Sequence, residues 1–225
     1  FYNLGMGGYP INVELMKYRY YCRYNPKPKY IIYDIDYIAM AIGEAKHNHQ
    51  SEQYLSLIYD KDMPAELRKV GYSALDVYFP LVRWWGYQTH IKRALFEFFK
   101  ISHHTEFASY KGFTPDPGVW NPAQLHFTDS VSGEMSEEAK QLLETALHEW
   151  REDGIQVILA NSPKYHPFYL MNQRRVEDKH YFDSLAHSMN ISYLDYCEDY
   201  WMCIDSTLFN AGVHLTPAGT DIYSA

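Results

Sequence analysis

The sequence has 225 residues, of which 47% are hydrophobic and 21% are charged, the usual composition of one globular domain with its own core. A formal net charge of −8 argues against a general binder of nucleic-acid backbones, because such proteins need clustered Lys and Arg. No apolar run reaches the roughly 20 residues needed to cross a bilayer, and the three cysteines lack the spacing of a zinc site.

The N-terminal part predicts a strand, a glycine turn, a helix and a second strand. Residues 1–4 indicate the end of a strand, and residues 5–8, Gly-Met-Gly-Gly, form the turn. Apolar side chains at helical spacing predict a helix over 11–23, which the Asn-Pro-Lys-Pro segment 25–28 ends. The apolar run over 30–36 becomes acidic at its end. It predicts a buried parallel strand whose carboxyl end opens onto a site.

The middle of the chain has weaker patterns. Helical periodicity indicates helices over 64–76 and 87–100. Residues 101–135 are rich in Pro, Gly, Ser and aromatic residues, so we expect an irregular insertion there, either a long loop or a small subdomain.

A clear helix–strand unit follows. Ser136 is a good N-cap with two glutamates in the first turn, and apolar residues then recur at helical spacing as far as Trp150. Gly154 is placed to end this helix, and a strand is expected over 155–160.

The C-terminal part repeats the alternation. We expect a helix over 168–189, a strand over 191–195, and a last helix capped by Thr216 with Pro217 in its first turn. Alternating strands and helices predict an α/β fold. The expected form is a three-layer sandwich with a flavodoxin-like, mostly parallel sheet of about five strands.

The segment 212–219 contains the strongest catalytic candidate. His214 comes directly before the capped helix, where a loop can hold an imidazole at the mouth of a sheet as a general base. A single histidine in such a position is more often structural, so the residue alone leaves both interpretations open.

Two segments resemble conserved blocks of the SGNH (GDSL-type) hydrolases. Residues 214–219, His-Leu-Thr-Pro-Ala-Gly, resemble the last block of that family, and residues 3–8, Asn-Leu-Gly-Met-Gly-Gly, resemble the second. The resemblance implies that His214 is the general base and that the backbone N–H of Gly8, with Gly7 as the neighbouring candidate, stabilises the oxyanion.

The third block of the family normally supplies an Asn as a second oxyanion donor. The matching stretch after the strand at 30–36 has no Asn, and Asp36 is the best positional match, followed by Asp34. A carboxylate donates no hydrogen bond unless it is protonated, so these acids are expected to cap a helix or to orient another polar group.

The last block normally has an Asp three residues before the histidine, which orients the imidazole. Ala211 occupies that position, while Asp205 and Asn210 lie nearby at other spacings. Substitution by either residue, a catalytic dyad and an inactive family member are the alternatives.

The nucleophilic serine of the first block has no counterpart in the sequence, and we expect it upstream of Phe1. Residues 1–225 are then a single SGNH-like domain that lacks this block. The resemblance implies a serine esterase or acyltransferase that acts on ester-linked acyl groups, such as acetyl, of a small molecule or glycan, without a cofactor or metal. It is similar to a bacterial branch that acts on polysaccharides outside the cytoplasm, so a periplasmic or extracellular location is expected. The alternative function is an inactive glycan-binding protein with the same fold.

Other candidates carry less weight. Ser162 ends a strand but lacks the G-x-S-x-G elbow of a nucleophile, and a Ser-Pro pair usually marks a turn. Two histidine pairs lack carboxylate partners at metal-site spacing. Aromatic residues of the middle segment suit either a sugar-stacking wall or ordinary packing. The histidines are His47, His49, His103 and His104, and the aromatic residues are Trp84, Trp85, Tyr110 and Trp120.

Overall fold

The computed structural model describes part of the chain, and the statements below concern that part. The described residues are 2–5, 11–35, 40–41, 60–61, 63–69, 73–79, 95, 99, 118, 120, 134–198 and 200–224. The chain folds into two compact units, of which the first comprises residues 1–43 and 109–225 and the second comprises residues 44–108.

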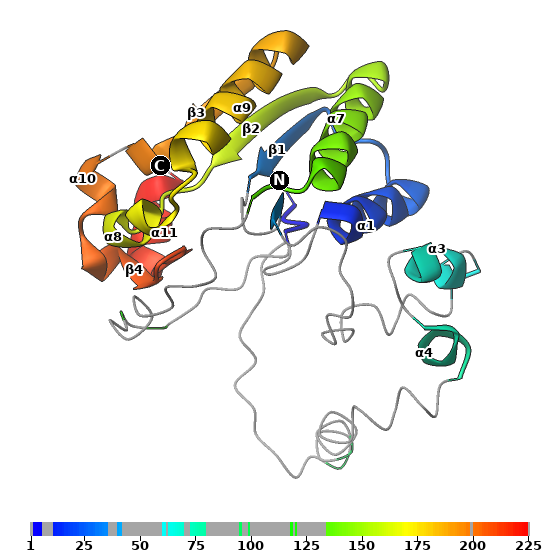
Figure 1. The fold of residues 1–225 in the computed structure, drawn as a ribbon. Helices are drawn as coiled ribbons and strands as arrows, with labels where there is room; N and C mark the ends of the chain where they lie inside the picture. Colours follow the sequence, from blue (N-terminus) through cyan, green and yellow to red (C-terminus); the bar gives the residue numbers. More distant parts are fainter. Residues whose placement is uncertain are drawn as a thin grey trace. The chain divides into compact units, whose positions relative to one another are not determined.

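The first unit contains a parallel sheet of three strands, β1 (Tyr30–Asp34), β2 (Gln156–Asn161) and β3 (Ser192–Asp195), in the order β1-β2-β3. The strands at 30–36, 155–160 and 191–195 are therefore confirmed, with slightly different ends. Helix α1 (Ile11–Tyr24) precedes β1, and α7 (Glu137–Glu152) precedes β2 (Figure 1). This alternation confirms the α/β class.

Helix α7 begins and ends where the sequence indicates. The Ser136 side chain accepts a hydrogen bond from the Ala139 backbone N–H at 3.0 Å, which satisfies one of the free donors of the first turn. After the helix, Gly154 has a φ of +73°, a conformation that a residue with a Cβ rarely adopts. The chain can therefore turn directly from α7 into β2.

One face of the sheet carries the core. Helices α1, α7 and α9 (Arg175–Met189) pack against alternate residues of the strands, since successive side chains of a strand point to opposite faces. The strand residues on this face are Ile31, Tyr33, Val157, Leu159 and Tyr193. The opposite face remains open to solvent at Tyr30 and Ile32, which are 59% and 55% exposed, and at Leu194. The described residues thus show a three-strand parallel sheet with helices on one face, and the five-strand sheet and the three-layer sandwich stay predictions.

The expected helix over 168–189 is two helices, which is a correction. Helix α8 (His166–Met171) ends before Asn172, and α9 begins at Arg175. The buried Asn172 side chain accepts from the Arg174 N–H at 2.9 Å and donates to Asp178 at 2.9 Å. These bonds stabilise a sharp turn that a continuous apolar pattern conceals.

The C-terminal segment adds short elements beyond the end of β3. In order they are the 3-10 helix η3 (Tyr196–Glu198), α10 (Tyr200–Cys203), the 3-10 helix η4 (Ser206–Leu208), β4 (Phe209–Ala211), β5 (His214–Leu215) and α11 (Pro217–Tyr223). Strands β4 and β5 form an antiparallel hairpin, which the sequence patterns did not predict. Thr216 caps α11 by accepting from Gly219 N, as expected.

The second unit contains two short described helices, α3 (Met63–Lys69) and α4 (Ala74–Tyr78), with Met63, Leu67 and Val77 buried. They replace the single helix expected over 64–76. Of the helix expected over 87–100, only residues 95 and 99 belong to the described part of the chain.

Candidate functional site at the carboxyl edge of the sheet

Each strand of the parallel sheet ends in a polar residue. Asp34 ends β1, Asn161 ends β2 and Asp195 ends β3, and the register pairs Asn161 directly with Asp195. Because parallel strands share one carboxyl edge, these three side chains gather at the place where α/β proteins usually carry their sites.

Asp34 organises the loop that follows β2. Its carboxylate accepts a hydrogen bond from the Ser162 backbone N–H at 3.0 Å. The Ser162 hydroxyl in turn donates to the hydroxyl of Tyr223, in α11, at 3.3 Å. Burial raises the pKa of Tyr223, so its hydroxyl stays protonated. The two weaker candidates, Asp34 and Ser162, therefore help to join β1, the loop after β2 and α11.

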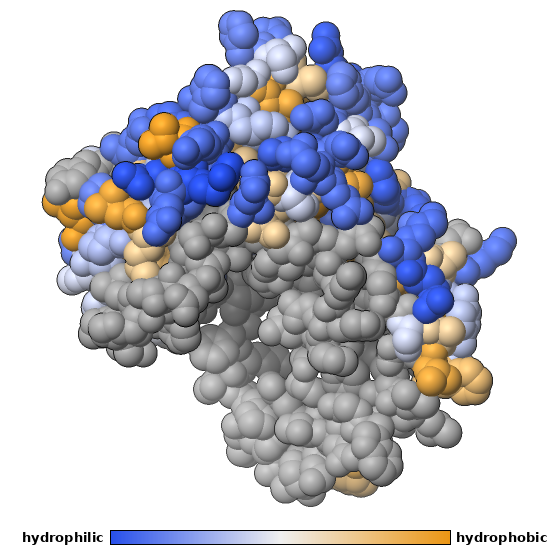
Figure 2. All heavy atoms as spheres, in the orientation of Figure 1, coloured by the Kyte–Doolittle hydropathy of each residue, from blue (hydrophilic) through white to orange (hydrophobic). Residues whose placement is uncertain are grey.

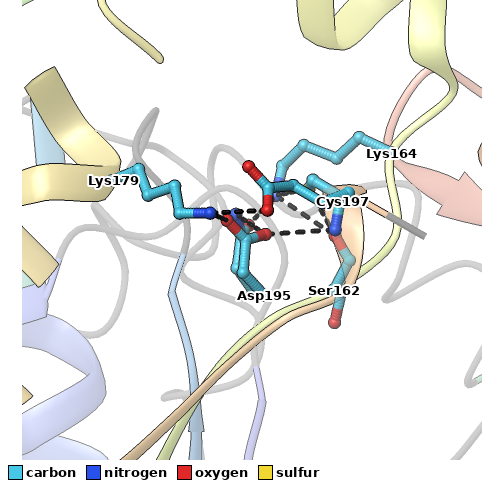
Figure 3. A network of polar contacts seen from close by, with 7 residues as sticks. Ser162, Lys164, Lys179, Asp195 and Cys197 are labelled. Atoms are coloured by element: carbon cyan, nitrogen blue, oxygen red, sulfur yellow. Dashed lines mark hydrogen bonds and ion pairs between the residues drawn. The ribbon is translucent and has the colours of Figure 1, made fainter. Parts of the chain in front are cut away.

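Asp195 is the centre of a buried network (Figure 3). Its side chain is only 7% exposed. The Oδ1 atom accepts from Asn161 Nδ2 at 2.9 Å and from the Cys197 N–H at 3.1 Å. The Oδ2 atom lies 3.9 Å from Lys179 Nζ, which also pairs with Glu198 at 2.6 Å. The hydrogen bond with Glu198 raises the pKa of Lys179. Asp195 thus connects β2, α9 and η3.

Lys164 is buried beside this network, with 4% of its surface exposed. Its ammonium donates to Asn161 Oδ1 at 2.5 Å and to the Ser162 carbonyl at 3.4 Å, and it lies 3.8 Å from Cys197 Sγ. The Cys197 thiol donates to the Ser162 carbonyl at 3.2 Å, and burial raises its pKa to about 12. A thiol with such a pKa is a poor nucleophile at neutral pH, so this cluster is suited to holding structure.

The sequence patterns do not indicate Lys164, Lys179, Asp195 or Cys197 as site residues. A signal was available for Asp195, because it is a polar residue at the end of a predicted strand, as Asn161 is. The two lysines and the cysteine belong to loops and a helix whose meeting depends on the register of β2 and β3.

His214 lies on β5 with its side chain exposed. Its hairpin is attached next to the loop after β2, because the Gly212 carbonyl accepts from the Tyr165 N–H at 2.9 Å. In Figure 1, β4, α8 and α11 lie beyond the carboxyl end of β2. The imidazole is therefore accessible and belongs to the same end of the first unit as the polar strand ends.

Neither of the two residues expected to support the imidazole bonds to it in the described part of the chain. Asp205 accepts from the Thr207 N–H at 2.9 Å and from the Thr207 hydroxyl at 2.7 Å, and these bonds lower its pKa. Asn210 is buried, and its Oδ1 atom has no hydrogen-bond partner among the described residues. Within 134–198 and 200–224, no side chain hydrogen-bonds the His214 ring. The described residues therefore contain no orienting acid for it.

Several candidates lie outside the described residues. Gly7, Gly8 and Asp36 are among them, so the expected oxyanion hole stays a prediction. The same holds for the histidine pairs and for most of the proposed aromatic wall, namely His47, His49, His103, His104, Trp84, Trp85 and Tyr110. Trp120 is described. Its ring packs edge-on against Tyr165 at 4.5 Å between centroids, which favours ordinary packing at that position.

Two further structural findings concern metals and membranes. In the described ranges, no three His, Cys, Asp or Glu side chains are grouped so that they could hold a metal ion. Among the helices that the structure describes, none combines the length and the apolar character of a membrane span.

The chain was compared with known protein families, curated proteins and solved structures. No protein-family model, no curated protein and no solved structure matches the chain. Similarity to known proteins therefore assigns no family to it.

Proposed function

We propose that this protein is an SGNH-like hydrolase or acyltransferase that acts on ester-linked acyl groups, with acetyl on a carbohydrate as the expected substrate. The proposal includes the complete family fold, a three-layer sandwich with a sheet of about five strands. The observation that carries it is the exposed imidazole of His214, on a hairpin hydrogen-bonded to the loop after β2.

In the proposed reaction, a serine hydroxyl attacks the ester carbonyl carbon while His214 takes the hydroxyl proton. The negative charge that develops on the carbonyl oxygen is stabilised by the Gly8 N–H. When the ester C–O bond breaks, His214 returns the proton to the leaving alcohol. A water or an acceptor hydroxyl then releases the acyl group. The family resemblance places the serine in a block ahead of the glycine turn at residues 5–8.

The test compares two exposed histidines in the full-length protein. His214→Ala is expected to lower kcat/KM for p-nitrophenyl acetate about 10²–10⁴-fold, because the general base is lost. The control His187→Ala removes an exposed histidine from the last turn of α9, so full activity is expected. Labelling by a fluorophosphonate would identify the serine. Unchanged turnover by His214→Ala would refute the assignment of the base.

A second candidate function is glycan binding by an inactive protein of the same fold. It is favoured by Ala211 at the usual Asp position and by the engagement of Asp205 with Thr207. Saturable glycan binding without esterase turnover and without fluorophosphonate labelling would support this function over the enzyme.

A further inference from the structure

A pocket of about 530 Å³ opens between α8, the first turns of α9 and η3. It lies next to the Asp195 network, since Lys179 contributes to both. The wall residues that matter for its chemistry are Tyr169, Leu170, Arg175, Val176, Lys179 and Glu198.

The wall has one cation without an acidic partner. Lys179 is paired with Glu198 at 2.6 Å and also faces Asp195 at 3.9 Å, so its charge is compensated. Arg175 donates to the Asn172 carbonyl at 3.2 Å and forms no ion pair with an acid in the described part of the chain. A guanidinium has five N–H donors, so most of those of Arg175 remain available.

A second donor faces the same space. The Tyr169 hydroxyl makes no hydrogen bond within the described ranges, and burial raises its pKa, so it stays protonated at neutral pH. The charges of Asp195 and Glu198 act on this hydroxyl more strongly than that of Arg175, and they also keep it protonated. Tyr169 and Arg175 both line the pocket, so a bound group there would meet both donors.

Two aliphatic side chains give the pocket an apolar part, beside His166 and Cys197, which also line it. Leu170 and Val176 are 47% and 68% exposed, which is high for aliphatic side chains at the mouth of a pocket. Figure 2 shows apolar side chains at the end of the first unit where α8 and α10 lie, whereas the outer surfaces of α7 and α9 are mostly hydrophilic. A ligand with an apolar body would cover part of this surface.

We propose that the pocket binds a small organic acid that has one carboxylate and an apolar body. The carboxylate accepts hydrogen bonds from the Arg175 fork and the Tyr169 hydroxyl, and the body packs on Leu170 and Val176. A planar carboxylate fits a guanidinium with two parallel hydrogen bonds. One uncompensated cation matches a monoanion better than a phosphate dianion, whose second charge would face Glu198.

The experiment titrates the full chain with hexanoate by calorimetry or NMR. We expect saturable binding, which Arg175→Gln weakens at least about tenfold because a charge-assisted hydrogen-bond pair is lost. The matched control Arg151→Gln alters an exposed arginine in the last turn of α7 and should bind as the original chain does. No saturable binding, or equal binding by Arg175→Gln, overturns the proposal.

Three measurements on the unaltered protein do not depend on the folding of a variant. Hexanol, which lacks the charge, should fail to compete with hexanoate, and inorganic phosphate should compete weakly. Glucuronate tests whether the carboxylate comes from a sugar instead of an acyl chain, and we expect it to bind less tightly. Competition by hexanol or tighter binding of phosphate contradicts the proposed ligand class, and tighter binding of glucuronate contradicts the apolar body. Because His214→Ala should leave hexanoate binding unchanged, the pocket and the proposed hydrolase activity can fail separately.

Discussion

The carboxyl edge of the sheet has two regions with opposite character. Around Asp195, buried charged and polar groups are connected by short hydrogen bonds between β2, η3 and the loop after β2. Around His214, the hairpin of β4 and β5 holds an exposed imidazole without a side-chain partner in the described residues. A buried charge is stable only when it is paired, whereas a reactive group has to stay accessible. We infer that the first region supports the fold and the second is available for chemistry.

The largest expected effect on stability comes from Asp195→Ala. Asn161 Nδ2 and the Cys197 N–H would both lose their acceptor in a buried place, so the free energy of unfolding should fall by about 3 kcal/mol. Urea unfolding followed by circular dichroism measures it. The control Glu198→Ala removes the exposed partner of Lys179 and should cost about 0.5 kcal/mol. Equal losses for both variants would show that the network is not the stabilising element.

A smaller effect should follow from the buried thiol of Cys197. Its folded pKa of about 12 exceeds the ordinary value of 9.0, so the stability it contributes is complete below pH 9 and is lost as the pH rises toward 12. Between pH 8 and pH 10 the loss should be about 1 kcal/mol.

Urea unfolding of the original chain and of Cys197→Ser at both pH values isolates this contribution, because the serine does not titrate in that range. The stability of the variant should depend less on pH. An identical pH dependence for the two proteins would mean that the thiol is not buried as described.

The smallest expected effect on stability is that of His214→Ala. The side chain is exposed and has no hydrogen-bond partner in the described residues, so the free energy of unfolding should change by less than about 0.5 kcal/mol. The same urea measurement tests it. A loss of more than about 1 kcal/mol would show that the imidazole supports the hairpin and is not a free, accessible group.

Local signals in the sequence predicted much of the regular structure. Ser136 and Gly154 set the limits of α7, Thr216 and Pro217 start α11, and apolar runs mark the three strands. Two short-range features were not visible in these signals. The turn at Asn172 rests on a side-chain hydrogen bond to Asp178 that interrupts a continuous apolar pattern, and the β4–β5 hairpin is too short to show an alternating pattern.

The candidate site also has one part that the local sequence indicates and another part that it does not. His214 was found from its own neighbourhood, because a histidine before a capped helix is visible in eight consecutive residues. The network of Lys164, Asn161 and Asp195 was not found. It joins residues 34 positions apart, and only the pairing of β2 with β3 brings them together.

The sequence by itself determined the α/β alternation, the limits of α7 and α11, and the identity of the exposed imidazole candidate. These depend on caps, turns and periodicity, which act within a few residues. Only the tertiary structure decided which charges are buried, that Lys164 and Asp195 share a network, and that Arg175 faces a pocket without an acidic partner among the described residues. Burial and pairing depend on elements distant in the chain, and strand register sets their contacts.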